Sequence, residues 1–235
     1  MNASRPRVVV VVFPGSQDDR DASWALAAVG AEPVLVWHAE TELPPRTGAV
    51  VLPGGFSYGD YLRCGAIARF APVMRAVADF ARDGGPVLGV CNGFQILCEA
   101  GLLPGVLRPN ASLSFVCRDV GVVVENAASP FTRRCEPGQR LTIPVKHGEG
   151  CYYAPPALLA EIEADGQIAL RYAPGDNPNG SVASIAGVLN EAGNVMGLMP
   201  HPEHAVDPLL GSGDGAFILA SLAEAAGVRL FASTG

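Results

Sequence analysis

The sequence predicts an α/β protein with a mostly parallel central sheet flanked by helices, and with mixed or antiparallel strands added in its second half. Up to Gly101, short apolar runs rich in β-branched residues alternate with helical patterns. Nearly continuous apolar runs are typical of strands that are covered on both faces. After Gly101 the chain changes to turn-rich, strand-like segments. The alternation in the first part therefore predicts parallel pairing with right-handed crossovers.

Four strands are expected in the first part, at residues 7–13, 32–38, 48–53 and 86–91. Between the first two, residues 18–30 (DDRDASWALAAVG) predict a helix that ends at Gly30. Another helix is expected from Ala66 to Gly84, because its apolar residues share one helical face. That face comprises Ile67, Phe70, Val73, Met74, Val77 and Phe80.

The second part predicts further strands and a closing helix. The strands are expected at residues 120–126, 140–148, 167–173, 181–190 and 194–200. Residues 214–227 (DGAFILASLAEAAG) predict a helix that Asp214 opens and Gly227 ends.

The composition indicates one domain over residues 1–235. With 49% hydrophobic and 17% charged residues the chain can bury a sizeable core, and no Ser/Gly-rich or Pro-rich linker divides it. The formal net charge of −7 argues against nucleic acid or an anionic membrane as a partner, because either favours a basic face.

The N-terminal segment and the thiols indicate the cytoplasm. The apolar run at residues 8–13 is too short to span a bilayer, and residues 1–13 lack the longer apolar stretch and cleavage site of a secretory signal. The six cysteines have no CxxC spacing, which fits reduced thiols better than a disulfide framework or a zinc site. Most of them are expected to be small core residues.

The segment GVCNG, at the end of the strand at 86–91, matches the nucleophile-elbow pattern with cysteine in place of serine. Gly89 and Gly93 leave room for a sharp turn that exposes Cys91 above the carboxyl edge of the sheet. The helix that follows favours a thiolate at its N-terminus, and the amide of Asn92 points toward a developing oxyanion. A glycine-rich strand-to-helix turn without catalytic function remains the alternative.

A catalytic thiol needs a base, and MPHPEH at residues 199–204 offers one. Prolines on both sides of His201 predict extended backbone, which places His201 and Glu203 on one side of the chain. A Cys91–His201–Glu203 triad is then expected, with the carboxylate fixing the imidazole tautomer. The alternatives are a solvated surface turn, or a metal site made with His204. A metal site is the weaker interpretation, because no further His or Cys pair has the spacing typical of metal ligands.

The loop at residues 52–68 begins where the strand at 48–53 ends. Gly54 and Gly55 free backbone N–H groups for close approach to a ligand, so Gly55 is a candidate second oxyanion donor. The alternative is an anion-binding or merely tight loop. Asp60 and Arg63 are expected either to bind a substrate or to pair with each other.

The motifs LPGGFSYGD (52–60), GVCNGFQIL (89–97) and MPHPE (199–203) resemble those of the class I, or triad-type, glutamine amidotransferases. More narrowly, the chain is similar to the glutaminase subunits of phosphoribosylformylglycinamidine synthases of purine biosynthesis. The narrower match rests on the segments at 13–16, 59–68, 177–190 and 193–203. The resemblance implies a flavodoxin-like sheet and covers nearly the whole chain.

Carried over by position, the resemblance implies Cys91 as nucleophile, with His201 and Glu203 completing the triad. It implies the amides of Gly55 and Asn92 as the oxyanion donors. The substrate-binding residues expected on the same basis are Gln95, Gly54 and, in the segment KHGEG, His147 and Gly148.

The implied reaction hydrolyses glutamine to glutamate and ammonia through a Cys91 thioester and needs no metal or organic cofactor in this chain. Free ammonia would mostly protonate in water, so an enclosed path to an acceptor is expected. The resemblance implies a larger ATP- and Mg-dependent synthetase subunit that converts formylglycinamide ribonucleotide to the amidine, and a small third subunit. The 235 residues leave no room for an ATP-using domain.

Two departures from the family pattern stand out. After FPG the family usually has Ser-Asn-Cys-Asp, whereas this chain has Ser16, Gln17, Asp18 and Asp19, so a cysteine that is not the nucleophile is absent. His-Pro-Glu is usually followed by arginine and here by His204. If that arginine serves the subunit interface, docking or its pH dependence is expected to differ.

Other functions remain to be separated from this one. Another class I amidotransferase subunit or a cysteine hydrolase of similar architecture would share Cys91 and His201, and a non-catalytic assembly subunit would need neither. A phosphate loop at GGFSYGD is disfavoured, because GxxxxGK[ST] and a strand-to-helix GxGxxG are both absent.

Overall fold

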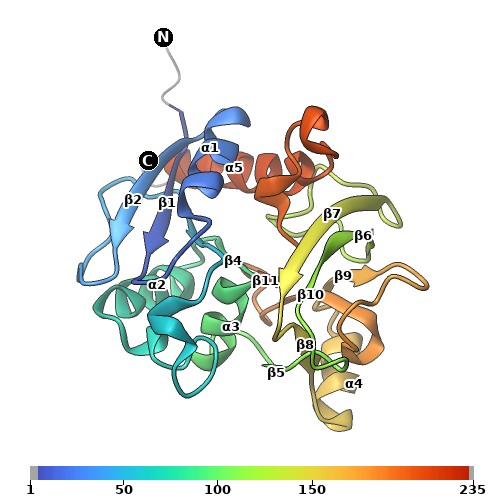
Figure 1. Ribbon diagram of the computed structural model, residues 1–235. Helices are drawn as coiled ribbons and strands as arrows, with labels where there is room; N and C mark the ends of the chain where they lie inside the picture. Colours follow the sequence, from blue (N-terminus) through green and yellow to red (C-terminus); the bar gives the residue numbers. More distant parts are fainter. Residues whose placement is uncertain (1–4, 233–235) are drawn as a thin grey trace.

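A computed structural model describes residues 5–232, and its core is a nine-stranded sheet of order β2-β1-β3-β4-β11-β10-β9-β6-β7 (Figure 1). The first five strands of this order are parallel to one another. They are β2 (Glu32–Trp37), β1 (Arg7–Val12), β3 (Ala49–Leu52), β4 (Val87–Val90) and β11 (Val195–Leu198).

The remaining strands of the sheet pair antiparallel. They are β10 (Ile185–Leu189), β9 (Ile168–Tyr172), β6 (Val116–Val124) and β7 (Arg140–His147). A small second sheet joins β5 (Val106–Arg108) to β8 (Cys151–Tyr153). The α/β class and the antiparallel addition in the second half are thereby confirmed.

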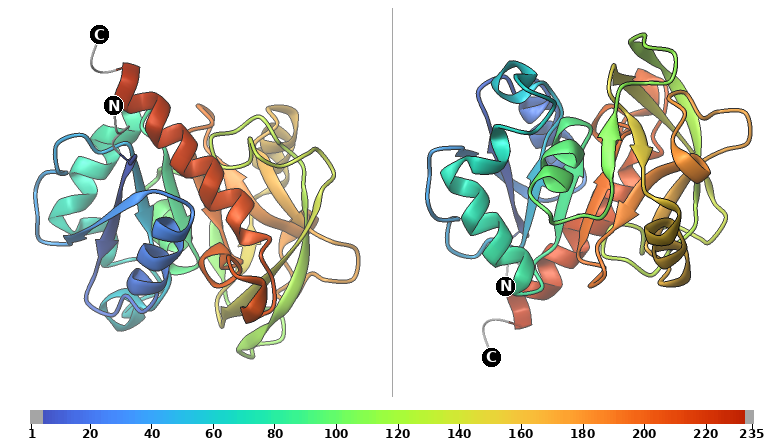
Figure 2. Two further views of the ribbon diagram at one scale, coloured as in Figure 1. Left: turned by 90° about the horizontal axis from the view of Figure 1, so that it is seen from above. Right: turned by 90° about the horizontal axis from the view of Figure 1, so that it is seen from below.

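Helices cover both faces of the parallel part (Figure 2). On one face, α1 (Asp19–Ala28) and α5 (Gly215–Ala232) pack against β1 and against each other. On the other face, α3 (Asn92–Glu99) packs against β3, β4 and β11. The 3-10 turn Ala68–Phe70 contacts both α3 and α2 (Pro72–Arg82). The continuous burial of β3 and β4 explains their uninterrupted apolar sequences. A fifth helix, α4 (Pro156–Ala164), lies beside the antiparallel part.

The helix expected from Ala66 begins later, at Pro72. Proline lacks the amide hydrogen that a helix interior needs but fits the first helical position. Residues Ala68–Phe70 form a separate 3-10 turn, and Phe70 is 73% exposed instead of lying on the buried face. The prediction for Phe70 was therefore wrong.

The closing helix is longer than expected, since it continues through Gly227 to Ala232. One glycine costs a helix about 1 kcal/mol, and the alanines around it favour helix formation. Within the described part of the chain, no helix is both long and apolar enough to cross a membrane.

Several local elements differ from the sequence prediction. β6 starts at Val116, and the stretch expected as a strand from 181 opens with the 3-10 turn Val182–Ser184. The strands β5 and β8 and the helix α4 were not anticipated. β5 and β8 have three residues each and pair only with one another, so local sequence carries little signal for them.

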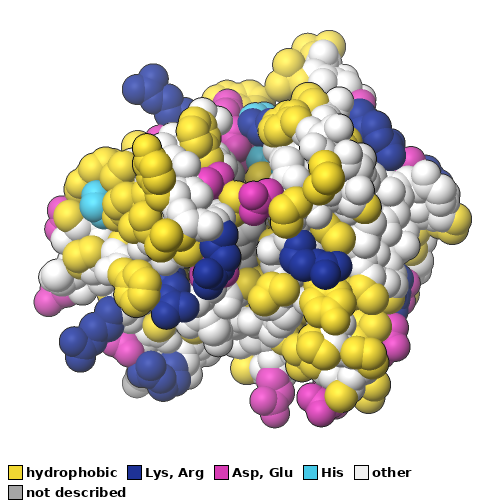
Figure 3. Space-filling view, turned by 60° about the horizontal axis from the view of Figure 1, so that its bottom comes forward, with side chains coloured by type: hydrophobic (Ala, Val, Ile, Leu, Met, Phe, Trp, Pro, Cys, Tyr) yellow, Lys and Arg dark blue, Asp and Glu magenta, His cyan; other side chains and the backbone are white. Residues whose placement is uncertain are grey.

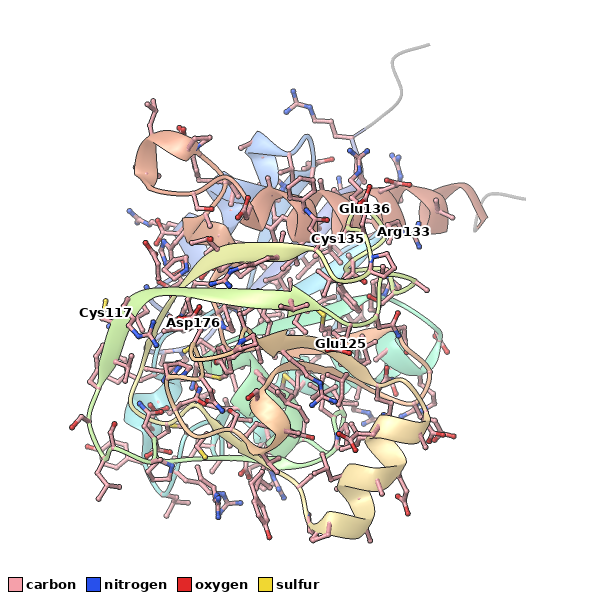
Figure 4. All side chains as sticks on the ribbon, turned by 90° about the vertical axis from the view of Figure 1, so that its right-hand side faces the viewer. Cys117, Glu125, Arg133, Cys135, Glu136 and Asp176 are labelled. Atoms are coloured by element: carbon pink, nitrogen blue, oxygen red, sulfur yellow. The ribbon has the colours of Figure 1, made fainter. Side chains whose placement is uncertain are left out.

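Asp176 holds the outer antiparallel strands together (Figure 4). Its carboxylate accepts a hydrogen bond from Gly121 N at 3.1 Å on β6 and one from Arg140 at 2.9 Å on β7. Arg118 contributes a further ion pair at 3.4 Å. This network fixes β7, whose carboxyl end carries Lys146 and His147 into the candidate site.

Candidate active site

Cys91 sits on a strained turn between β4 and α3. Its φ of 49° and ψ of −104° lie in a region that residues with a side chain rarely occupy. The glycines on either side make the turn possible: a Cβ on Gly93 would lie 2.0 Å from the Leu52 carbonyl oxygen, and one on Gly89 would lie 2.6 Å from the Gly93 carbonyl. The elbow predicted from GVCNG is therefore present.

The sheet order brings the elbow next to the histidine segment. Cys91 follows β4, His201 follows β11, and these strands are adjacent and parallel. Cys91 N donates a hydrogen bond to the Leu198 carbonyl at 2.8 Å. The buried thiol lies at the N-terminus of α3 and donates a long contact, 3.8 Å, to the Lys146 carbonyl. Helix amides at such a position favour a negatively charged sulfur.

His201 and Glu203 form a buried pair, with His201 Nδ1 2.6 Å from Glu203 Oε1. The prediction of an extended backbone around His201 was wrong, because Pro202–His204 forms a 3-10 turn. The turn folds Glu203 back onto the imidazole of the residue two positions earlier. Nδ1 donates to the carboxylate, which leaves Nε2 as the nitrogen available for chemistry.

The surroundings of His201 favour its charged form. Burial alone lowers the pKa of His201, but the Glu203 carboxylate and the Cys91 sulfur outweigh burial and raise it above its ordinary value. Among the described residues, His201 Nε2 and Glu203 Oε2 are buried without a hydrogen-bond partner. The imidazole therefore has one nitrogen fixed and the other uncommitted.

Asp18 is a further site residue, which no motif in the sequence indicates. Its carboxylate reaches His201 Nδ1 at 3.6 Å, Lys146 Nζ at 2.5 Å and His204 Nε2 at 3.3 Å. The two departures from the family pattern, Asp18 and His204, are thus in direct contact. That both positions differ from the family pattern was the one sign in the sequence of a link between them. Nothing local in the sequence shows that the two side chains are in contact.

The two loop glycines have different surroundings. Gly55 has a φ of 137° and forms an isolated bridge with Ser16, and a Cβ there would lie 2.6 Å from the Gly15 carbonyl oxygen. Gly54 faces Asp18 and His201: an added Cβ would lie 2.3 Å from Asp18 Oδ2 and 2.7 Å from His201 Cε1. Gly54 thus provides the space in which these two side chains meet.

Gln95 links α3 to the loop after β7. Its Nε2 donates to the Glu149 carbonyl at 2.7 Å, and its Oε1 accepts from Asn92 Nδ2 at 2.8 Å. Asn92 Oδ1 also accepts from Ser57 N at 3.0 Å, which ties the elbow to the glycine loop. The expected oxyanion and substrate residues on these elements therefore belong to one connected network.

His147 is buried in a polar network of its own. Its Nδ1 lies 3.1 Å from Asn110 Oδ1 and its Nε2 3.4 Å from Asn179 Nδ2. Burial and the charge of His201 lower the pKa of His147 to about 4. His147 is therefore neutral at pH 7, and together with Gly148 it lines the pocket that contains Cys91.

The expected alternative of an Asp60–Arg63 pair is wrong. Arg63 pairs with Glu99 instead, at 2.6 Å. Asp60 accepts a hydrogen bond from Asn92 Nδ2 at 3.3 Å and lines the pocket. Burial, together with the charge of Glu149, raises the pKa of Asp60 above its ordinary value.

These residues surround a cavity of about 440 Å³, which is ample for an amino acid. The lining includes the predicted residues Gly55, Cys91, Gln95, His147, Gly148 and His201. Figure 3 shows this side of the molecule hollowed between its two halves, with acidic and histidine side chains in the hollow and hydrophobic ones on both rims. A larger open hollow of about 1400 Å³ beside α2 has no cysteine in its lining among the described residues.

The metal alternative gains one ligand candidate in the structure. Ligand atoms of Asp18, His201, Glu203 and His204 lie within 4.8 Å of one another. Lys146 Nζ already contacts Asp18, however, and the Nδ1 proton of His201 is held by Glu203. A metal ion would have to displace both contacts, so the geometry fits a hydrogen-bonded acid–base group better.

A family model for the CobB/CobQ-like glutamine amidotransferase domain matches residues 5–216. The chain is 62% identical to the phosphoribosylformylglycinamidine synthase subunit PurQ of Rubrobacter xylanophilus, over 94% of this chain and all of that protein. The PurQ of Frankia casuarinae is 57% identical, over 89% of each chain. Among solved structures, PurLQS from Thermotoga maritima matches with a TM-score of 0.85 and 45% identity, over 93% of this chain and 97% of that one.

Proposed function

The chain belongs to the CobB/CobQ-like glutamine amidotransferase family, and on that premise we propose that it is the glutaminase subunit of a phosphoribosylformylglycinamidine synthase. The observation that carries this proposal is the 62% identity over the full length of a PurQ protein, in a chain whose elbow cysteine shares a pocket with a His–Glu pair. The sheet that runs through both halves supports one amidotransferase domain.

In the proposed reaction, Cys91 attacks the side-chain carboxamide carbon of glutamine. The thiol proton passes to His201 Nε2, while Glu203 stabilises the resulting imidazolium through Nδ1. The backbone N–H groups of Gly55 and Asn92 stabilise the oxyanion, a contribution on the order of 3 kcal/mol per donor. His201 then protonates the departing nitrogen, the C–N bond breaks, and ammonia leaves a Cys91 thioester.

Hydrolysis of the thioester completes the cycle. His201, now neutral, removes a proton from water, and the hydroxide adds to the thioester carbonyl. The C–S bond breaks as His201 returns that proton to the sulfur, so that Cys91 and the neutral His201 are restored and glutamate leaves. Every proton passes through His201 Nε2, the nitrogen that carries no hydrogen bond within the described chain.

The cavity also suits the amino-acid end of glutamine. Asp60 and Glu149 both line the cavity, and the negative charge of their carboxylates favours binding of an α-ammonium group. We assign Gln95, His147 and Gly148, which line the cavity, supporting roles in this subsite, whereas the expected residue Gly54 leaves room for Asp18 and His201 instead. The side chains of Gln95 and His147 act by fixing the walls, because their polar atoms are engaged within the protein.

The proposed partners are an ATP- and Mg-dependent synthetase subunit, which receives the ammonia, and a small third subunit. PurLQS of Thermotoga maritima supports such an assembly. Exposed apolar side chains stand near the mouth of the cavity: Phe56 and Phe115 line it, and Tyr61 and Leu62 follow on the loop. Exposed apolar patches beside a pocket are typical of docking surfaces. ATP and Mg are assigned to the synthetase and none to this chain.

The test is covalent labelling by a glutamine analogue with an electrophile at the side-chain carbonyl. Intact mass is expected to rise by one adduct, mapped to Cys91, blocked by glutamine and absent in Cys91→Ala. Cys117 is exposed and points away from the body of the protein at the start of β6, so all variants carry Cys117→Ser (Figure 4). An adduct that glutamine does not block would favour a cysteine hydrolase of another substrate class.

A non-catalytic assembly subunit makes the opposite prediction in the reconstituted complex. In that case Cys91→Ala would retain glutamine-dependent synthesis of the amidine. The proposed function requires this variant to lose glutamine-dependent synthesis while ammonia-dependent synthesis continues. Another class I amidotransferase subunit would instead transfer ammonia to a different acceptor.

A further inference from the structure

Asp18 occupies the N-cap position of α1 without capping the helix. Aspartate is among the preferred N-cap residues, because its carboxylate accepts hydrogen bonds from the first free amides. Here the side chain makes no capping hydrogen bond. Its backbone serves the helix, since the Asp18 carbonyl accepts from Ala22 N at 2.8 Å. The Asp18 carboxylate therefore makes its contacts outside the helix.

That carboxylate points at the imidazole of His201. Oδ2 lies 3.6 Å from His201 Nδ1, on the same nitrogen that Glu203 holds at 2.6 Å. The Asp18 side chain is only 4% exposed. Two buried carboxylates therefore face one nitrogen of the proposed general base.

The carboxylate stays charged because Lys146 and His204 hold its other oxygen. Lys146 Nζ lies 2.5 Å and His204 Nε2 3.3 Å from Oδ1. Burial by itself raises the pKa of Asp18, but the hydrogen bond from His204, the charge of His201 and the contact with Lys146 together hold it well below its usual range. Asp18 therefore acts as an anion throughout the physiological pH range.

The backbone is shaped for this arrangement. Gly54 leaves the space that Asp18 Oδ2 and His201 Cε1 occupy, and a Cβ there would lie 2.3 Å from the carboxylate oxygen. The Gly54 carbonyl also accepts a hydrogen bond from Asp18 N at 3.3 Å. Asp18 is thus fixed from both its main chain and its side chain.

We propose that Asp18 is a positioning residue for His201: a second carboxylate that stabilises the imidazolium together with Glu203 and is itself held by Lys146 and His204. The inference rests on the proposed function, because it concerns the same histidine. It deepens that function, because the charge on the His201 imidazole is then controlled by four side chains. These are Asp18, Glu203, Lys146 and His204.

The charged and titratable groups that face His201 determine in which direction its pKa should move when Asp18 loses its charge. Glu203 and Asp18 favour its proton, Cys91 favours it as thiolate, and Lys146, His147 and His204 oppose it when they are charged. Removing the charge of Asp18 is therefore expected to lower the pH at which His201 loses its proton, by about one unit. A residue with only a structural role would not move this midpoint.

The experiment follows the His201 ring by NMR titration of the full chain in a Cys91→Ser background, where no thiol titrates at that position. His201→Gln identifies the resonance. Asp18→Asn and Asp18→Ser are both measured, because asparagine and serine are also preferred N-cap residues and should preserve α1. The matched control is Asp21→Asn, which removes the same charge from the exposed side of the first turn of α1.

A midpoint about one unit lower in either folded Asp18 variant, with Asp21→Asn unchanged, is the expected result. An unchanged midpoint in the folded variants overturns the inference. Labelling of Cys91 by the glutamine analogue tests the proposed function separately. A labelled wild type with an unmoved His201 midpoint refutes only the role of Asp18, whereas a wild type that stays unlabelled with the synthetase subunit present refutes the proposed function.

Discussion

His204 Nε2 lies 3.3 Å from Asp18 Oδ1, although 186 positions separate the two residues along the chain. The contact joins the start of α1 to the 3-10 turn that carries the catalytic pair proposed here. These are also the two positions at which the sequence departs from the family pattern. A double-mutant cycle should therefore detect coupling between them, as expected for side chains in one buried network.

That coupling is measurable in glutaminase turnover by the reconstituted complex. Asp18→Asn and His204→Asn are each expected to lower kcat, and the double variant to lower it by less than the product of the two effects. The reason is that either substitution already removes the shared contact. Strictly multiplicative effects would contradict the coupling. Asp21→Asn combined with His204→Asn serves as the uncoupled control.

Glu203→Gln should lower kcat on the order of 10³-fold with little change in KM, because the amide cannot stabilise the imidazolium as the carboxylate does. The substituted side chain has nearly the same shape and can keep the buried 2.6 Å contact with His201. The chemical step is therefore expected to slow, while the affinity for glutamine stays nearly unchanged. Glutamate release at saturating glutamine gives the measurement. A loss confined to KM would assign Glu203 to the substrate site instead.

His147 should make stability depend on pH. Its pKa in the fold is about 4, below the ordinary value of 6.5, so folding favours the neutral ring. Its contribution is complete above pH 6.5 and is lost as pH falls toward 4, up to about 3 kcal/mol.

Urea unfolding at several pH values measures this effect. The stability difference between wild type and His147→Gln is expected to narrow as pH falls from 7 to 4, and contributions of other groups largely cancel in that difference. A difference that stays constant over this range would contradict the pKa direction of His147.

Gly93→Ala is expected to destabilise the protein by about 3 kcal/mol or more, because a Cβ would lie 2.0 Å from the Leu52 carbonyl oxygen and neither backbone can yield easily. The comparison is Gly101→Ala, where φ is +69° but nothing lies within 4 Å of the added Cβ. That variant should cost only about 1 to 2 kcal/mol of backbone strain. Equal losses of unfolding free energy would contradict the larger cost expected from crowding at Gly93.

Leu62→Asp tests the proposed docking surface. Leu62 is 89% exposed on the loop beside the cavity, so a charge there should leave the fold intact but weaken assembly with the synthetase. Glutamine-dependent amidine synthesis is expected to fall while ammonia-dependent synthesis stays constant. Leu209→Asp, at a leucine that is 92% exposed on the 3-10 turn Pro208–Leu210, is the control. An equal loss in both variants would argue against a specific surface.

The elbow and the His–Glu pair could be predicted because their determinants are local. An apolar run followed by Gly89, Cys91 and Gly93 specifies a tight strand-to-helix turn wherever the strand lies in the sheet. His201 and Glu203 are two residues apart, so a single turn suffices to join them, even though the turn proved to be 3-10 and not extended. The strands β1, β3 and β4 were predictable for the same reason, since burial on both faces leaves its mark on each strand separately. The edge strand β2 was correctly located, but the expectation that both its faces are covered was wrong, because Leu35 and Trp37 are exposed.

Other features depend on which elements become neighbours. β11 pairs with β4, and that strand order brings His201 close to Cys91 although the two residues are 110 positions apart in the sequence. Arg63 pairs with Glu99 and not with the nearer Asp60, and Phe70 is left exposed by the break at Pro72. Pairing between distant segments is a property of the whole fold, and local propensity carries little information about it.

The sequence by itself thus predicted the α/β class and the residues proposed here as nucleophile, base and carboxylate, because each is encoded within a few consecutive residues. Only the tertiary structure decided that Asp18 joins them. Its carboxylate meets His201, Lys146 and His204 because α1, β7 and the 3-10 turn converge at the carboxyl edge of the sheet. A buried charge is stable only where partners from all these elements surround it, and that condition exists in the folded chain alone.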